Sequence, residues 1–212
     1  MTDILAAFDA AFREAPLVAI LRGLTPAEAP AVGDALVEAG FTLLEVPLNS
    51  PEPIESIRLL AERLAGRAMV GAGTVLTTDD VARVRDAGGT LIVSPNTEPE
   101  VIRASVAAGL ASLPGYFTAS EGFAALAAGA TALKLFPADG TTPAYLKAQR
   151  AVLPKATRML AVGGITPHNM AEWRAAGADG FGLGSNLYRP GKSAAAVGED
   201  ARQYLTALKD LA

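Results

Sequence analysis

Residues 41–74, FTLLEVPLNSPEPIESIRLLAERLAGRAMVGAGT, contain the pattern that decides the fold. The apolar run 41–47 predicts a buried strand, Ser50-Pro51 predicts the start of a helix that extends to about Leu64, and 68–74 predicts a second strand. Consecutive strands joined through a helix are parallel, since a parallel pair needs a long crossover connection. The stretch therefore predicts an α/β protein.

The same strand–helix unit repeats along the chain. Helices that end in Ala-Gly mark the repeat at Gly40, Gly88, Gly109, Gly129 and Gly177, which are spaced by one or two lengths of a unit of roughly 20 to 24 residues. The expected strands are 17–21, 41–47, 68–74, 91–96, 111–114, 132–137, 159–164 and 180–185. Each is followed by an expected helix, beginning near Thr25, Ser50, Thr78, Glu98, Thr118, Thr142, Thr166 and Ser193.

Eight such units favour a compact (β/α)8 TIM barrel over an open doubly wound sheet. We expect it to form one domain, 1–212, with an extra amphipathic helix over 1–15 before the first strand. The open sheet is disfavoured because Gly71-x-Gly73 lacks the third glycine of a dinucleotide-binding fingerprint.

Composition narrows the possible partners. Half of the 212 residues are hydrophobic and only 19% are charged, which excludes disordered and fibrous classes. The formal charge of −4 and the absence of a stretch of transmembrane length predict no nucleic-acid partner and no membrane partner. The chain has no cysteine, and His168 is the one histidine, so no residues have the spacing of metal ligands. We therefore expect no metal and no cofactor. The absence of cysteine is also compatible with a cytoplasmic protein, and we expect its partner to be a small molecule.

One lysine interrupts an otherwise apolar strand at residues 132–137, ALKLFP. Burying the Lys134 ammonium is costly unless it is paired or neutralised, and a lysine with a lowered pKa is a nucleophile that forms Schiff bases with carbonyl compounds. The alternative is that Lys134 points from the strand end into solvent or pairs with a carboxylate. Which of these holds depends on the residues around it.

Polar residues and glycine pairs fall at the predicted strand ends, where TIM barrels place their active sites. They are Arg22, Glu45, Asn49, Thr74, Ser94, Lys134, Gly163-Gly164 and Gly184-Ser185. A carboxylate at Glu45 is suited to general acid–base work, or alternatively to a structural ion pair with Lys134 or Arg22. The two glycine pairs, each followed by a helix or short segment, predict a phosphate site, although tight turns alone also use such glycines.

These residues resemble the motifs of the 2-keto-3-deoxy-6-phosphogluconate and 2-dehydro-3-deoxy-6-phosphogalactonate aldolases. The likeness extends from about Leu17 to Gly191 and rests on ILRG (20–23), EVPLNSP (45–51), GAGTV (71–75), SPN (94–96), KLFP (134–137), VGGI (162–165) and GLGS (182–185). It implies a homotrimer in which Lys134 forms the Schiff base and Glu45 is the general acid and base. It also implies the substrate-binding residues Arg22, Thr74, Pro95, Phe136, Gly163, Gly164, Gly184 and Ser185.

Two positions distinguish the branches of the family. The gluconate branch typically has Glu-Val-Thr-Leu-Arg where this chain has EVPLN (45–49), so Asn49 stands in place of an arginine. That branch also has a threonine where this chain has Val162. Both departures resemble the galactonate branch. Loss of the arginine leaves Arg22 to bind the substrate carboxylate, and loss of the threonine hydroxyl should change the discrimination between C4 epimers.

The resemblance therefore implies a class I aldolase that cleaves 2-dehydro-3-deoxy-6-phosphogalactonate to pyruvate and glyceraldehyde 3-phosphate without a metal. Three alternatives stay open from the residues. The first is the same reaction with the gluconate C4 epimer as the main substrate. The chain can also be a phosphate-binding transferase or isomerase of the thiamine-phosphate-synthase or phosphosugar-epimerase kind, in which Lys134 only pairs with a substrate anion, or a non-catalytic phosphosugar-binding module.

Overall fold

The predicted barrel is present in a computed structural model that describes residues 4–211. Within this range, nine parallel strands form one sheet in the order β5-β4-β3-β2-β1-β9-β8-β7-β6. The strands are β1 (Leu17–Ile20), β2 (Leu43–Pro47), β3 (Met69–Gly73), β4 (Leu91–Val93), β5 (Ala111–Leu113), β6 (Gly115–Tyr116), β7 (Leu133–Leu135), β8 (Met159–Val162) and β9 (Gly180–Leu183).

The strands β5 and β6 are two halves of one barrel strand, separated by Pro114. The two halves close the sheet: the Gly115 N–H donates to the Ser94 carbonyl at 3.0 Å, and the Lys134 N–H donates to the Pro114 carbonyl at 3.0 Å. Counting β5 and β6 together leaves eight barrel strands, so the (β/α)8 prediction is confirmed.

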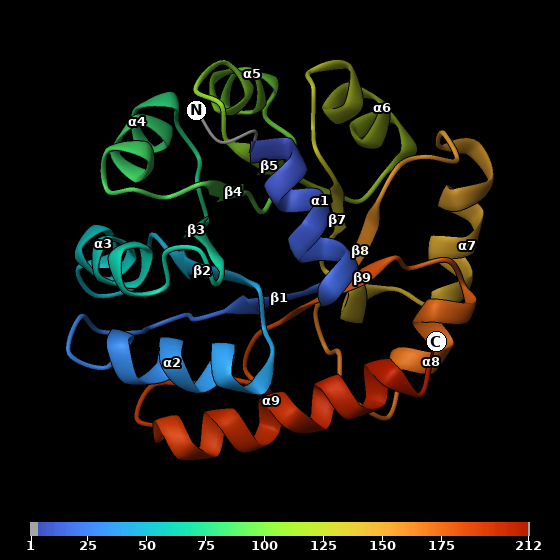
Figure 1. The fold of residues 1–212 in the computed structure, drawn as a ribbon. Coiled ribbons are helices and arrows are strands. Elements are labelled where there is room, and N and C mark those ends of the chain that lie inside the picture. The colour runs from blue at the N-terminus through green and yellow to red at the C-terminus, as the bar shows by residue number, and fades with distance from the viewer. Residues whose placement is uncertain (1–3, 212) are drawn as a thin grey trace.

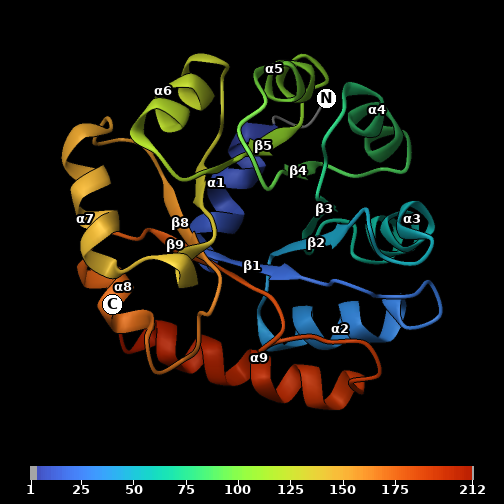
Figure 2. The same cartoon turned by 180° about the vertical axis from the view of Figure 1, so that it is seen from behind.

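Helices surround the strands, one after each barrel strand, in a ring seen from both ends in Figures 1 and 2. They are α2 (Ala29–Ala39), α3 (Pro53–Arg63), α4 (Thr78–Asp86), α5 (Pro99–Ala107), α6 (Ala119–Ala127), α7 (Pro143–Val152), α8 (Met170–Ala175) and α9 (Ala194–Lys209). The first and last of them, α2 and α9, lie side by side in both views. Their apolar faces and the outward faces of the strands form the outer core layer.

The additional helix α1 (Ile4–Glu14) crosses one end of the barrel (Figure 1). Its Phe8 and Phe12 are buried and belong to the same cluster as the inward-facing strand residues. Arg158 holds the helix in place through an ion pair with Asp9 at 2.6 Å and through cation–π contacts with both phenylalanine rings. The predicted N-terminal helix is confirmed for residues 4–14; Ala15 lies just after its end, and residues 1–3 lie outside the described residues.

Several predicted helix starts are shifted. The start predicted near Thr118 agrees with the structure, where Thr118 and Glu121 form a capping box at α6, but the N-cap of α4 is Thr77 rather than Thr78. The helix predicted at Thr25 begins at Ala29, because the Thr25 N–H and hydroxyl bind the Glu28 carboxylate in a separate turn.

The helix predicted to begin at Thr166 begins at Met170 instead. The side chain of Asn169 explains the shift, because its Oδ1 accepts from the Thr166 N–H at 2.9 Å and its Nδ2 donates to the Gly164 carbonyl at 2.9 Å. These bonds satisfy the backbone in a turn that precedes the helix. His168 lies in this turn and is exposed.

Candidate active site

Lys134 on β7 and Glu45 on β2 face the same small cavity inside the barrel. Lys134 is 7% exposed and Glu45 is 2% exposed. Both side chains line a cavity of about 10 Å³ whose other walls are apolar apart from Gly182. The Glu45 carboxylate rests against Gly73, where an added Cβ would lie 2.0 Å from Glu45 Oε2. The two residues that the sequence assigned to chemistry are therefore both buried on the inner face.

Glu45 and Lys134 are close enough to influence each other electrostatically but form no direct ion pair. Within residues 4–211, no ion pair within 4.0 Å joins Glu45 to Lys134 or Arg22, and Glu45 Oε2 has no hydrogen-bond partner. Lys134 Nζ lies 4.6 Å from the centroid of the Phe136 ring, a cation–π contact. A buried carboxylate oxygen without a partner is the kind of group that a bound substrate satisfies.

Burial shifts the pKa values of both groups toward their neutral forms. It raises the pKa of the Glu45 carboxyl to about 7, against the opposing influence of the Lys134 and Arg22 charges. It also lowers the pKa of the Lys134 ammonium; the Glu45 carboxylate opposes this change, and Arg22 adds to it. A lowered lysine pKa increases the fraction of free amine, which is the nucleophilic form.

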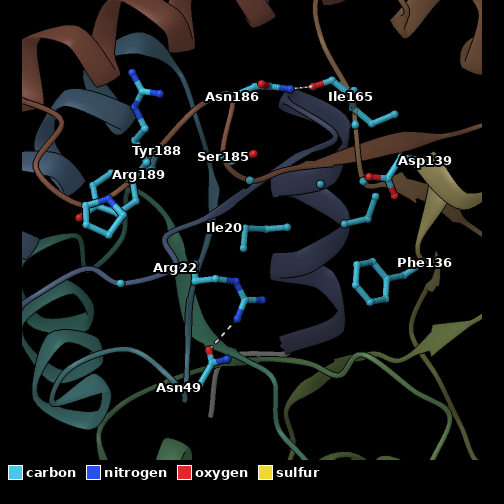
Figure 3. A pocket seen from close by; sticks show the side chains of 17 residues that line it. Ile20, Arg22, Asn49, Phe136, Asp139, Ile165, Ser185, Asn186, Tyr188 and Arg189 are labelled. Carbon is cyan, nitrogen blue, oxygen red and sulfur yellow. Dashed lines mark hydrogen bonds between the residues drawn. The ribbon is translucent and has the colours of Figure 1, made fainter.

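A pocket of about 440 Å³ lies over the strand ends at the end of the barrel opposite α1 (Figure 3). It adjoins the small cavity, because Ile20, Val162 and Gly182 line both. The predicted site residues that line the pocket are Arg22, Asn49, Phe136, Val162, Gly163, Gly164, Gly184 and Ser185. At its edge, Arg22 Nη1 donates to Asn49 Oδ1 at 2.7 Å, so Asn49 contacts the residue that was predicted to bind the substrate carboxylate.

The glycine-rich end of the pocket is shaped by close backbone packing. Gly163 and Gly164 have φ values of +120° and +66°, in the left-handed region. The 3-10 segment η1 (Ala138–Gly140) packs against them, so that a Cβ on Gly163 would lie 2.7 Å from Asp139 Oδ1. The backbone N–H groups of Gly164 and Ser185 make no hydrogen bond within the described chain. Such free N–H groups are suited to binding an anion.

Comparison with known proteins identifies the family of this chain. The sequence profile of the KDPG and KHG aldolases matches residues 8–197. The chain belongs to the KDPG and KHG aldolase family. This aldolase is 50% identical over 194 residues to the probable 2-dehydro-3-deoxy-6-phosphogalactonate aldolase of Rhizobium meliloti (strain 1021), over 92% of each chain. It is 47% identical over 195 residues to the 2-dehydro-3-deoxy-6-phosphogalactonate aldolase of Escherichia coli (strain K12), over 92% of this chain and 95% of the relative.

A solved structure described as native KDPGal has the same fold as this aldolase. The two superpose with a TM-score of 0.91 at 46% identity, covering 92% of this chain and 95% of that chain. The agreement covers the barrel that carries Lys134 and Glu45. Because identity is this high over nearly the full length, the fold and the aldolase class both follow from the comparison.

Two predicted substrate-binding residues of this aldolase, Thr74 and Pro95, do not line the pocket or the small cavity. Thr74 directly follows β3 and has a φ of +56°, which is unusual for a β-branched residue. Ser94 has a structural contact, since its hydroxyl donates to the Val75 carbonyl at 2.8 Å.

Sequence reasoning assigned no role to four polar residues that line the pocket of this aldolase, namely Asp139, Asn186, Tyr188 and Arg189. Asp139 had a usable signal, because it is the first carboxylate after the lysine strand in chain order. Asn186 lies beside the predicted Gly184-Ser185 pair, and its side chain donates to the Ile165 carbonyl at 3.1 Å (Figure 3). Tyr188 is 1% exposed, and no sequence pattern distinguishes it from a core aromatic residue.

Residues 4–211 of this aldolase contain neither a candidate metal site nor a candidate membrane-spanning helix. No three His, Cys, Asp or Glu side chains there are grouped so that they could hold a metal ion. No helix there combines the length and the apolar character needed to cross a bilayer.

Proposed function

We propose that the chain is a class I aldolase that cleaves 2-dehydro-3-deoxy-6-phosphogalactonate to pyruvate and D-glyceraldehyde 3-phosphate. The observation that carries the proposal is a buried lysine with a lowered pKa beneath a pocket whose far end is rich in glycine. The relatives that are 50% and 47% identical carry the name of this reaction. The proposal includes the homotrimer and the cytoplasmic location expected from the sequence.

The mechanism begins with the free amine of Lys134. The amine attacks the C2 ketone, water leaves, and the protonated imine becomes an electron sink. Glu45, directly or through one water, takes the proton from the C4 hydroxyl, and the C3–C4 bond breaks to release glyceraldehyde 3-phosphate. The protonated Glu45 carboxyl then returns this proton to C3 of the enamine on Lys134, and hydrolysis of the resulting imine frees pyruvate and restores both the amine and the carboxylate.

The remaining residues bind the two ends of the substrate in this proposal. Arg22 offers its guanidinium to the carboxylate, while the hydrogen bond to Asn49 orients it. Thr74 and Pro95 are assigned to the pyruvate end and Phe136 to the wall beside the lysine. The phosphate is assigned to the free backbone N–H groups of Gly164 and Ser185, together with Gly163 and Gly184 at the same end of the pocket.

Borohydride trapping tests this chemistry. Reduction in the presence of pyruvate should add one reduced pyruvyl group, which peptide mass spectrometry should locate on Lys134. A chelator should leave cleavage activity intact, because the iminium ion supplies the electron sink. Absence of the adduct, or loss of activity in chelator, contradicts the proposal and favours a barrel in which Lys134 pairs with a substrate anion.

Val162→Thr should shift the preference between the two C4 epimers toward the gluconate. Val162 is 5% exposed and lines both the pocket and the small cavity, so a hydroxyl placed there is available to the C4 oxygen. A site that gains such a partner changes discrimination by about tenfold or more. The measurement is the rate of pyruvate release from each epimer, compared side by side for wild type and variant.

Wild-type rates that are equal, or that favour the gluconate, contradict the proposed substrate. Val84→Thr is a matched control, because Val84 is a buried valine on α4 in the outer core layer and lies away from the pocket. It should leave the ratio of the two rates unchanged.

A further inference from the structure

The backbone turn at the end of β3 sets the position of the Glu45 carboxylate. An added Cβ on Gly73 would lie 2.0 Å from Glu45 Oε2 and 2.4 Å from Oε1, so the carboxylate occupies the space directly over the Gly73 Cα atom. Glu45 Oε2 makes no hydrogen bond within residues 4–211. Close contact with the β3 backbone, rather than a hydrogen bond to Oε2, therefore decides where this oxygen lies.

That stretch of backbone adopts a strained conformation. Thr74 has a φ of +56°, in the left-handed region that a β-branched residue rarely adopts. Strained residues persist only where their surroundings hold them. Before Thr74 in the chain, the backbone is held by the Leu48 N–H, which donates to the Gly73 carbonyl at 2.8 Å. With this attachment alone, the backbone after Thr74 would be free to move at Val75 and so relieve the strain.

The end of β4 provides the second attachment. The Val75 N–H donates to the Val93 carbonyl at 3.2 Å, and the Ser94 hydroxyl donates to the Val75 carbonyl at 2.8 Å. Ser94 is 3% exposed, so removing its hydroxyl leaves a carbonyl with no ready replacement from solvent. In the described part of the chain, no other side chain hydrogen-bonds to the backbone of 73–75.

We infer that Ser94 is a positioning residue for Glu45, acting through the Val75 carbonyl and the left-handed turn at Thr74 rather than by touching substrate. The inference rests on the proposed function, since it matters only if Glu45 transfers the proton. Its consequence is a specific defect. Without the Ser94 hydroxyl the turn relaxes, the carboxylate moves from its place over Gly73, and the proton-transfer step slows while imine formation on Lys134 continues.

Two assays separate these steps. Exchange of the pyruvate methyl protons with deuterated water reports proton transfer at C3, and borohydride trapping reports the imine. In Ser94→Ala we expect exchange at saturating pyruvate to fall about tenfold or more, because small displacements of catalytic groups have effects of this order. The trapped adduct on Lys134 should be unchanged.

A matched control and a second background complete the experiment. Ser105→Ala removes a hydroxyl that is equally buried and also donates to a backbone carbonyl, that of Val101, but within α5 and away from the turn; it should leave exchange unchanged. Glycine adopts the left-handed conformation without strain. In a Thr74→Gly background, Ser94→Ala should therefore lower the rate of exchange by about threefold or less.

Several outcomes overturn the inference. The first is a rate of exchange in Ser94→Ala that equals that of wild type, and the second is an equal loss of exchange in Ser105→Ala. The third is a loss of exchange from Ser94→Ala that is as large in the Thr74→Gly background as in wild type. The fourth is a joint fall of adduct, exchange and thermal midpoint in Ser94→Ala, because this marks a general loss of stability. Failure of the proposed function is recognised separately, because the wild-type protein itself then forms no adduct.

Discussion

Lys134→Met abolishes the borohydride-trapped pyruvate adduct and lowers cleavage by more than roughly 10⁴-fold, the order of loss seen when a covalent nucleophile is removed. The thioether cannot add to a carbonyl, and no other lysine lines the pocket or the small cavity of the described chain. Mass spectrometry of the trapped protein and initial rates of pyruvate release are the two measurements.

The fold should survive this change. Lys134 is 7% exposed, and burial lowers its pKa because the ammonium is poorly solvated there. Methionine has a similar length and no charge to bury, so the free energy of unfolding should be at least as high as that of wild type. A denaturant titration that shows a marked loss of stability, with residual cleavage, favours a structural role for the lysine.

Lys147→Met is the matched control for this experiment. Lys147 is an exposed lysine on α7, outside the pocket. Its replacement should leave adduct formation, cleavage and stability at wild-type values. An equal loss of cleavage in this variant means that the effect at Lys134 reflects charge in general rather than the imine.

The strands were predictable because both faces of a parallel barrel strand are covered, so each reads as a short apolar run. Their ends were less predictable. The strand predicted over 91–96 ends at Val93, shortly before Pro95, which has no N–H to donate to a neighbouring strand. Helix starts at Thr25 and Thr166 were misplaced for a different reason, since local side-chain hydrogen bonds form separate turns there.

The two buried ionisable residues of the candidate site were visible in the sequence, but their packing was not. A lysine in an apolar strand and a glutamate at a strand end are visible in the sequence, and the structure places both on one inner cavity. The reason for Gly73 is not visible, because the atom that excludes a Cβ there belongs to Glu45 on another strand. Gly182 is similar, since an added Cβ would lie 2.7 Å from Val162 Cγ2.

Glu45→Gln should slow exchange of the pyruvate methyl protons by about 10²- to 10⁴-fold, the usual contribution of a general acid–base group. The amide has nearly the same shape as the carboxyl but does not accept a proton at neutral pH. The adduct on Lys134 should still form, because the amine needs no proton transfer from Glu45 to reach the ketone. Deuterium exchange followed by NMR and borohydride trapping measure the two steps separately.

Glu38→Gln is the control, because Glu38 is an exposed glutamate on α2 away from the pocket, and it should leave both assays unchanged. Exchange in Glu45→Gln within about threefold of wild type contradicts the assigned role, since the loss expected for a general base is much larger.

The pH dependence gives an independent check on the same carboxyl. Burial raises the pKa of Glu45 from 4.5 to about 7, so exchange by the wild type should rise with pH through about 7 as the base ionises. Between these two values the folded state binds a proton that the unfolded state has released, so the free energy of unfolding should fall as pH rises from 4.5 to 7. Glu45→Gln removes both effects. If the variant keeps the rise in exchange or the fall in stability, another group is responsible and Glu45 is not the base.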